Sequence, residues 1–489
     1  MLSALSRIPF LCLLAFCIGH AASLGLYYAD DAWFACMAKS LASGRGYATP
    51  WGKLEEAGRY LPFNPKTGVG PAIILPMAAG IFLFGNRGPV PEISIILLWF
   101  LLLLLIDRAV RRIAKPGRFL FPAVVTVSIF AIFGWHIETW TAGLGEAVAT
   151  LAAALSFLLW ASARKPRDFA AAGLAFGLAI EAKLIVLLAL PALAVATLAG
   201  RRPNDAPREH SPVAGAAAYA IGCCAPIFAF EAWKMAVLGA AGYLANWREY
   251  LAFVRELGAP GAAGSLAALI RERFEALRYR FGIDPCVLIA ALAAILFAGF
   301  RLEKAEARRA TTACAAAMAC LFAYWLLFSN GWPRYAIVSL IFLCLCYGMI
   351  VAFAKWPYAL AVLALAVAGH RQGFSKLNFA MELADNGLFR DASPKREHDQ
   401  VVAALEAMIA EGKTAQIASQ HWATFADISF ALKEPSAIGA VSDSSFGSGG
   451  EGVYAYNRDY FDGAAALPPR MRLGVVYSGQ HYAIERIRR

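Results

Sequence analysis

Long apolar runs separated by short polar segments dominate roughly the first three quarters of the sequence. Most of them reach or approach the roughly 20 apolar residues that a helix needs to cross a hydrocarbon core about 30 Å thick. The runs of this kind are 8–28, 90–106, 119–134, 144–162, 213–238, 286–300, 311–328, 336–353 and 356–369. The pattern predicts a mainly α fold, a polytopic transmembrane helical bundle.

Two further apolar stretches do not fit a single straight span. Segment 71–85 lies just before 90–106, and only an odd number of crossings fits between an outer loop and the basic loop that follows. We therefore expect one of these two segments to be re-entrant or interfacial. The stretch 170–200 carries Glu181 and Lys183 in mid-run, which favours two short helices joined near the outer surface. The expected total is about 11 to 13 spans.

The sequence changes to ordinary soluble character after the last apolar run. Apolar residues recur at helical spacing in 400–412, and short strand-like runs follow at 414–419, 473–478 and 481–487. The chain is therefore predicted to consist of a transmembrane domain, 1–372, and a small α/β domain, 373–489.

Composition agrees with a membrane protein, because 60% of residues are hydrophobic and only 16% are charged. The formal net charge of +11 is gathered mainly in short loops that follow spans, which the positive-inside rule places in the cytoplasm. No aromatic stripe accompanies these basic clusters, so we expect membrane lipids and no nucleic acid as their partners. The ten cysteines show neither CxxC nor metal-ligand spacing, which is typical of small packing residues.

The charge distribution also predicts the orientation. We expect an inner (plasma) membrane protein with a cytoplasmic N-terminus, with segments 29–70 and 240–284 and the C-terminal domain on the outer side. Segment 240–284 is amphipathic and rich in arginine. Such charge usually marks a solvated face, and contact with an acceptor or with anionic lipid is the second interpretation.

The first outer segment places two carboxylates, Asp30 and Asp31, side by side. Apolar residues follow at helical spacing (Trp33, Phe34, Met37 and Leu41), with Gly44 and Gly46 as terminators. Asp30 is expected as the N-cap of a helix that lies flat on the membrane, with Trp33 as an interfacial anchor. The carboxylates can simply favour the positive end of the helix dipole. Two adjacent carboxylates repel, however, and one would suffice, which favours a functional role.

This stretch, ADDAWFACMAKSLASGRGY, resembles the first outer loop of the GT-C superfamily of glycosyltransferases, which includes protein O-mannosyltransferases and the aminoarabinose transferases of lipid A. Segments 64–85, 173–193 and 331–343 are similar to later motifs of the same superfamily, in the same order. Asp-Asp replaces the Asp-Glu of many relatives, and Asn64 stands where some carry His or Glu.

The resemblance implies a GT-C enzyme that transfers a hexosyl or pentosyl group, usually with inversion. Its donor would be a polyprenyl-phosphate sugar, and its acceptor a hydroxyl of an envelope lipid, glycan or protein. Asp30 is assigned as general base. Asp31 would orient it, or hold the acceptor or a divalent metal, and residue order does not exclude the reverse assignment. No cofactor is certain from the sequence.

A departing phosphate needs positive charge, and cations in or near a bilayer are functional candidates. Arg334 beside Tyr335 is the first candidate for donor phosphate binding, and Lys183 is the second. The alternatives are an interfacial arginine that extends to lipid headgroups, and a Lys183 that pairs with Glu181 or with nearby backbone.

Four other residues are candidates for a substrate or acceptor loop: Asn64, Lys66, Glu138 and Glu146. Glu146 has an equal claim to a structural role at the start of a helix. His136 is interpreted as an interfacial histidine rather than a metal ligand. The competing function is a transporter or flippase for a lipid-linked or anionic substrate, which predicts functional charges near the bilayer midplane and repeated broken helices.

Overall fold

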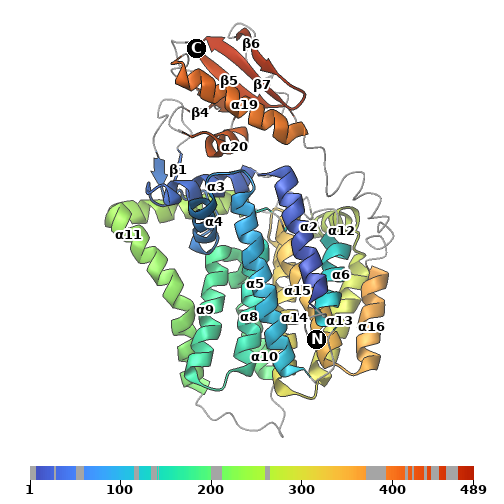
Figure 1. Ribbon diagram of the computed structural model, residues 1–489. Helices are drawn as coiled ribbons and strands as arrows, with labels where there is room; N and C mark the ends of the chain where they lie inside the picture. The colour runs from blue at the N-terminus through green and yellow to red at the C-terminus, as the bar shows by residue number, and fades with distance from the viewer. Residues whose placement is uncertain are drawn as a thin grey trace.

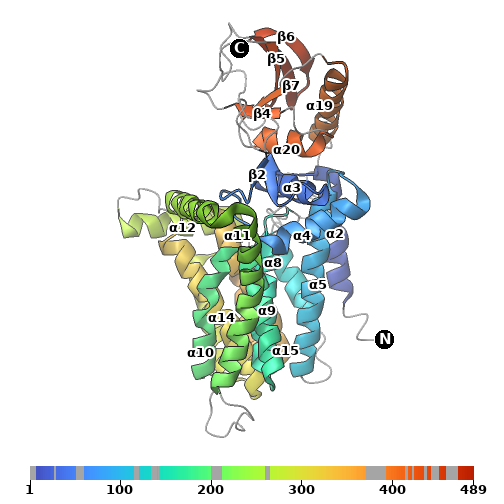
Figure 2. The same ribbon diagram turned by 90° about the vertical axis from the view of Figure 1, so that its left-hand side faces the viewer.

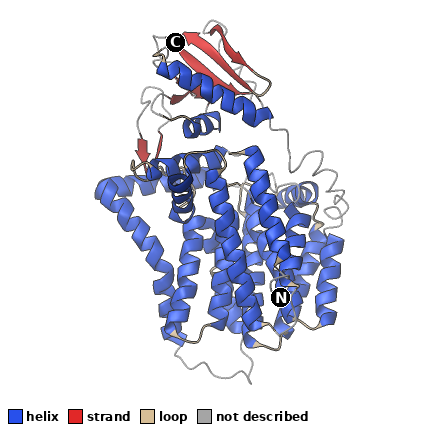
Figure 3. Cartoon of the chain, in the orientation of Figure 1, coloured by secondary structure: helices blue, strands red, loops and turns tan. Residues whose placement is uncertain are grey.

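The computed structural model describes residues 7–26, 29–50, 60–114, 120–133, 140, 142–199, 212–258, 265–369, 393–412, 417–420, 423–433, 438–441, 451–458 and 472–488. Helices run side by side through a large bundle, and a small unit of helices and strands lies beyond one end of it (Figures 1 and 3). We refer to this as the α3 end of the bundle, because helix α3 (Ala29–Ala42) lies across it (Figure 2).

The bundle helices follow the predicted apolar runs closely. They are α2 (Ile8–Leu24), α5 (Val90–Ile113), α6 (Phe121–Phe133), α8 (Glu146–Ser162), α9 (Pro166–Ala182), α10 (Pro191–Ala199), α11 (Pro212–Gly258), α13 (Pro285–Arg301), α14 (Ala305–Leu327), α15 (Pro333–Phe353) and α16 (Trp356–Gly369). Among the described residues, 4 helices are long and apolar enough to cross a membrane: Val90–Ile113, Val213–Glu256, Ala305–Leu327 and Arg334–Phe353. The other apolar helices have 10–17 residues, so the predicted span count stays a prediction.

Helix α4 (Pro71–Phe84) accounts for the parity problem between 71–85 and 90–106. Its 14 residues give a length of about 21 Å, too short to cross a 30 Å core. It lies at the α3 end (Figures 1 and 2), whereas α5 has 24 residues and runs along the bundle. This placement favours 71–85 as the re-entrant or interfacial segment, and the assignment stays a prediction.

The stretch 170–200 forms two helices, as predicted. Helix α9 ends at Ala182, Lys183 has an extended backbone, and a short 3-10 helix, η2 (Leu184–Ala189), leads into α10. Lys183 thus lies in the break between them.

Helix α9 packs closely along α11, and glycines allow this approach. A Cβ at Gly173 or Gly177 would overlap the α11 backbone at Tyr219 or Cys223. The four-residue spacing of these glycines is the small-residue pattern that brings helices together in membranes. Helix α11 then kinks at Gly239, where φ is 67°, and its second part lies at the α3 end with α12 (Leu266–Phe281) (Figures 1 and 2).

The small unit contains a five-stranded sheet in the order β4-β3-β5-β7-β6. Its strands are β3 (Ile417–Gln420), β4 (Ile438–Val441), β5 (Glu451–Asn457), β6 (Arg472–Ser478) and β7 (Tyr482–Arg488). Strand β3 is parallel to β4 and β5, while β7 is antiparallel to β5 and β6. Helix α19 (Ser393–Ala410) packs on β7, and α20 (Ala423–Ala431) lies between the sheet and α3 (Figure 1).

Candidate active site

Helix α3 carries the aspartate pair and begins two residues earlier than expected. It starts at Ala29, so Asp30 and Asp31 both occupy its first turn, and the prediction of Asp30 as N-cap was wrong. Carboxylates in a first turn interact favourably with the helix dipole. The helix ends before Gly44 and Gly46, whose φ values of 77° and 85° suit glycine.

Helix α3 lies across the end of the bundle, and other parts of the chain pack against it. It packs between α4 and α20, and Trp33 is only 6% exposed. The thiol of Cys36 donates to the carbonyl oxygen of Ala426 at 3.2 Å. The predicted role of Trp33 as an interfacial anchor was wrong, because protein from the far end of the chain covers the helix.

Asp30 forms an ion pair with Arg334, which is the second residue of α15. Both side chains remain partly exposed, at 23% and 22%. The positive charge of Arg334 is unfavourable at the positive end of the α15 dipole, and the negative charge of Asp30 compensates for it. The Arg334 guanidinium also lies over the rings of Trp332 and Tyr335, at 4.5 and 5.4 Å from their centroids. Tyr335 therefore lies beside the predicted phosphate-binding arginine.

Lys183 approaches the same place from the break between α9 and α10. Its Nζ lies 3.1 Å from Glu146 Oε1 and donates to the carbonyl oxygen of Leu144 at 3.0 Å. Glu146 in turn interacts electrostatically with Arg334. The structure thus joins Asp30, Arg334, Glu146 and Lys183 in one cluster, which we call the charged cluster.

Of the two alternative partners predicted for Lys183, Glu181 was wrong, whereas a contact with backbone is found at the Leu144 carbonyl oxygen. The Glu181 carboxylate lies against Gly70, and it interacts electrostatically with Glu231 and Lys234 of α11. The backbone carbonyl of Glu181 accepts a 2.7 Å hydrogen bond from the N–H of Gly70. Glu181 near the end of α9 and Lys183 in the break therefore have different neighbours.

Asp31 differs from its neighbour in being fully buried. Its carboxyl group interacts with that of Glu92, which is 1% exposed in the first turn of α5, and the positive charge of Lys395 also acts on Glu92. Because two neighbouring carboxylates repel each other when both are charged, we infer that the pair shares a proton. The sequence analysis did not identify Glu92. A glutamate in the first turn of an otherwise apolar span is the signal that could have found it.

Of the other residues predicted from the sequence, Asn64 and Lys66 belong to the loop before α4. Asn64 is buried, donates to Thr49 Oγ1 at 3.0 Å and accepts from the backbone N–H of Lys66 at 3.0 Å. These bonds organise the loop itself, and the Lys66 side chain is exposed. Glu138 and His136 lie outside the described residues.

Within the described part of the chain, no three His, Cys, Asp or Glu side chains are grouped so that they could hold a metal ion. Asp31, the residue predicted to hold a metal if one is used, has the Glu92 carboxyl group as its neighbour. A divalent metal therefore stays a prediction.

The charged cluster gathers the first turns of three helices, α3, α8 and α15, around one place. The positive ends of their dipoles converge with two cationic side chains, Arg334 and Lys183. Such an arrangement favours binding of an anion beside a carboxylate.

The architecture is similar to that of solved membrane proteins. ArnT from Cupriavidus metallidurans bound to undecaprenyl phosphate superposes with a TM-score of 0.61 at 13% identity, covering 98% of this chain and 97% of that one. The chain has the GT-C fold. The apo structure of the same ArnT gives a TM-score of 0.59 at 14% identity with the same coverage. The structural likeness confirms the predicted GT-C resemblance at the level of the fold. No protein-family model and no curated protein matches the sequence.

Proposed function

We propose that this chain is a membrane glycosyltransferase of the GT-C kind. In this proposal it moves a sugar from a polyprenyl-phosphate donor to a hydroxyl acceptor of the cell envelope. The reaction takes place at the α3 end, which faces the outer side of the inner membrane, and the C-terminal unit is extracytoplasmic. The fold shared with ArnT supports the reaction class, and the undecaprenyl phosphate bound to that ArnT supports a lipid-linked donor.

The observation that carries the proposal is the ion pair between Asp30 and Arg334. It brings a carboxylate that can accept a proton next to a guanidinium that can bind phosphate. Asp30 would remove the proton from the acceptor hydroxyl as its oxygen attacks the anomeric carbon of the sugar. The bond from that carbon to the phosphate oxygen breaks, and the phosphate leaves with the bonding electrons. Arg334 would stabilise the charge that develops on it.

The different surroundings of the two aspartates support Asp30 as the base. Its side chain is 23% exposed, so an acceptor can reach it. Asp31 is fully buried against Glu92, which suits a residue that fixes the first turn of α3 and orients its neighbour. Lys183, which Glu146 holds 3.1 Å away, would add a second positive charge near the phosphate.

The charge distribution fits this function better than transport. A transporter of an anionic substrate places its site near the bilayer midplane, at discontinuous helices. The break at Lys183 instead lies beside Glu146 and Arg334, at the end of the bundle that carries α3.

The test is mass spectrometry of lipid-linked sugars and envelope glycans from cells that carry the wild-type gene, no gene, or a variant. Asp30→Asn should abolish the sugar transfer seen with the wild type, because a general base typically contributes about 10²- to 10⁴-fold, while protein abundance in the membrane stays the same. Asp168→Asn makes the same chemical change at an exposed site and should transfer normally. A fully active Asp30→Asn variant would remove the catalytic assignment.

A further inference from the structure

One arginine of α12 differs from its neighbours on the same helix. Arg273 is buried, with 3% exposure, whereas Arg271 and Arg278 are exposed. Arginines on surface helices normally extend their guanidinium groups into water or towards lipid headgroups. Burial of a charge is costly unless specific partners compensate for it, so the contacts of Arg273 indicate what the burial achieves.

Those contacts lead to the turn that precedes α15. Arg273 Nη2 donates to the carbonyl oxygen of Ser329 at 3.2 Å, and Nη1 donates to Glu272 Oε1 at 2.9 Å. The guanidinium also packs directly against Gly331, where an added Cβ would overlap it. Gly331 has a φ of 80°, so both its backbone conformation and this contact require glycine.

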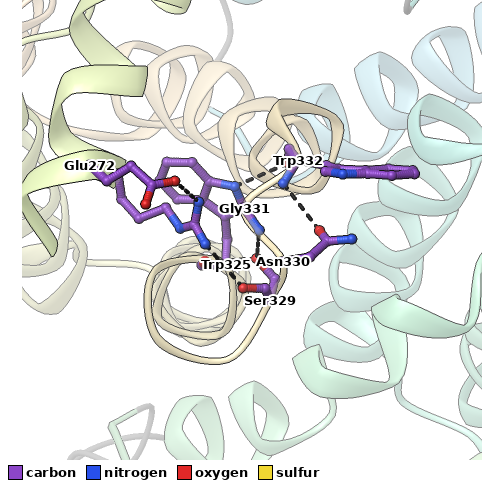
Figure 4. A network of polar contacts seen from close by, with 7 residues as sticks. Glu272, Trp325, Ser329, Asn330, Gly331 and Trp332 are labelled. Carbon is purple, nitrogen blue, oxygen red and sulfur yellow. Dashed lines mark hydrogen bonds and ion pairs between the residues drawn. The ribbon is translucent and has the colours of Figure 1, made fainter. Parts of the chain in front are cut away.

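The turn 329–332 is well fixed internally (Figure 4). The indole N–H of Trp325 donates to the carbonyl oxygen of Trp332 at 3.1 Å, and the Gly331 N–H donates to Ser329 Oγ at 3.1 Å. The Trp332 N–H donates to Asn330 Oδ1 at 3.2 Å. The bond from Arg273 differs from these three, because its donor lies on another helix, α12.

The same turn determines where Arg334 lies. Helix α15 begins at Pro333, directly after the turn, and Arg334 is its next residue. Trp332 stacks on Tyr335 with ring centroids 6.3 Å apart, and the Arg334 guanidinium lies over the Trp332 ring. Contacts therefore continue from Arg273 through the turn to the ion pair between Arg334 and Asp30.

We propose that Arg273 is a positioning residue for the lipid phosphate site. It holds the turn 329–332 in place, and through that turn it fixes the guanidinium of Arg334 for the phosphate of the donor. Helix α12 lies at the α3 end of the bundle (Figures 1 and 2). Its position is therefore coupled to phosphate binding through Arg273. The inference rests on the proposed function, in which Arg334 binds that phosphate.

The experiment measures binding of undecaprenyl phosphate to the purified full-length protein in detergent. Arg273→Gln should weaken binding about tenfold or more, and Gly331→Ala, which displaces the same guanidinium, should do likewise. Arg273→Lys should recover part of the affinity, because an ammonium can still donate to Ser329. Arg271→Gln, on the exposed side of the same helix, is the matched control and should bind as the wild type does.

A double-variant cycle separates positioning from a general structural effect. With Arg334→Ala already present, Arg273→Gln should cause no further loss, because the group it positions is gone. Wild-type affinity in Arg273→Gln, or a loss that simply adds to that of Arg334→Ala, would overturn the inference. If the wild type fails to bind undecaprenyl phosphate, or Arg334→Ala binds it as the wild type does, the donor phosphate site itself is wrong.

Discussion

At the residue scale, adjacent aspartates on one helix turn have different partners. Asp30 lies at a partly exposed ion pair with Arg334, while Asp31 is fully buried against a second carboxyl group. Two carboxyl groups buried side by side repel each other when both are charged, so we infer a shared proton that ties the first turn of α3 to the first turn of α5. We infer that this tie sets the direction in which Asp30 points.

The shared proton predicts different effects for two substitutions of Glu92. Glu92→Gln keeps a donor for Asp31 and should leave the free energy of unfolding nearly unchanged. Glu92→Ala removes the partner of a buried carboxyl group and should lower it by about 1–3 kcal/mol. Thermal unfolding of the purified protein measures both, with Glu275→Ala on the exposed side of α12 as control. An equal loss of unfolding free energy in both Glu92 variants would exclude the shared proton.

The sequence predicted the participants of the charged cluster better than their pairing. Asp30, Arg334, Lys183 and Glu146 were all candidates, since charges beside apolar runs are conspicuous. The pairings depend on how α5, α8 and α9 pack in three dimensions, which no local sequence pattern indicates. Lys183 pairs with Glu146, and Glu92 lies beside Asp31.

At the element scale, α3 is held from both sides, by α4 and by α20. The Lys39 ammonium donates to the carbonyl oxygens of Phe430, at 2.7 Å, and of Leu432, at the end of α20. Asn86 donates to the same Phe430 oxygen at 2.7 Å. A cation at a helix C-terminus interacts favourably with the dipole, so Lys39 fastens the C-terminal unit to the helix that carries Asp30.

Lys39→Met keeps the apolar stem and removes the ammonium. Loss of hydrogen bonds from a charged donor should weaken the attachment of α20 by about 1–3 kcal/mol. Hydrogen exchange of the α20 amides should then become faster by about tenfold or more. Lys433→Met, at an exposed position just after α20, is the matched control. Unchanged protection of α20 in Lys39→Met would exclude this attachment.

The helices themselves were predictable, because apolar runs and their polar ends are local signals. The surroundings of α3 were not, since the residues that cover it come from 426–432, nearly 400 positions later in the chain. The same spacing of Trp33, Phe34 and Met37 suits contact with lipid and contact with protein.

At the scale of the whole molecule, a histidine whose side chain is only 14% exposed, His398, lies in the unit that covers α3. His398 Nε2 is 3.2 Å from Asp427 Oδ2, which also accepts from the Tyr482 hydroxyl at 3.2 Å. Burial lowers the pKa of His398, but the carboxylates of Asp427 and Asp399 outweigh this, and its pKa lies above the ordinary 6.5. The folded unit therefore holds this proton more tightly than the unfolded chain does.

The sign of the pH effect follows from linkage. The stabilisation from protonated His398 is complete below pH 6.5, its ordinary pKa, and is lost as the pH rises through the raised value. Unfolding of the C-terminal unit, followed by hydrogen exchange in β7, should therefore become easier as the pH rises above 6.5. His398→Gln should flatten this dependence, whereas His481→Gln should keep it. A rise in stability over that range would contradict the assignment.

The change in composition after residue 370 lies between the helices of the bundle and the helices and strands that follow them. How the two parts meet was not predictable from the sequence, because the contacts involve single side chains such as Lys395, which donates to the Ala22 carbonyl oxygen at 2.9 Å.

The central claim is that Asp30 and Arg334 belong to one site that binds a lipid phosphate. Its most direct test is the dissociation constant of undecaprenyl phosphate for the wild type, Arg334→Ala and Asp30→Asn. Arg334→Ala should weaken binding about 10- to 100-fold, because a charged hydrogen bond is lost. Asp30→Asn should tighten it about tenfold, since the competing carboxylate is removed. Unchanged binding by Arg334→Ala, or weaker binding by Asp30→Asn, would contradict the account.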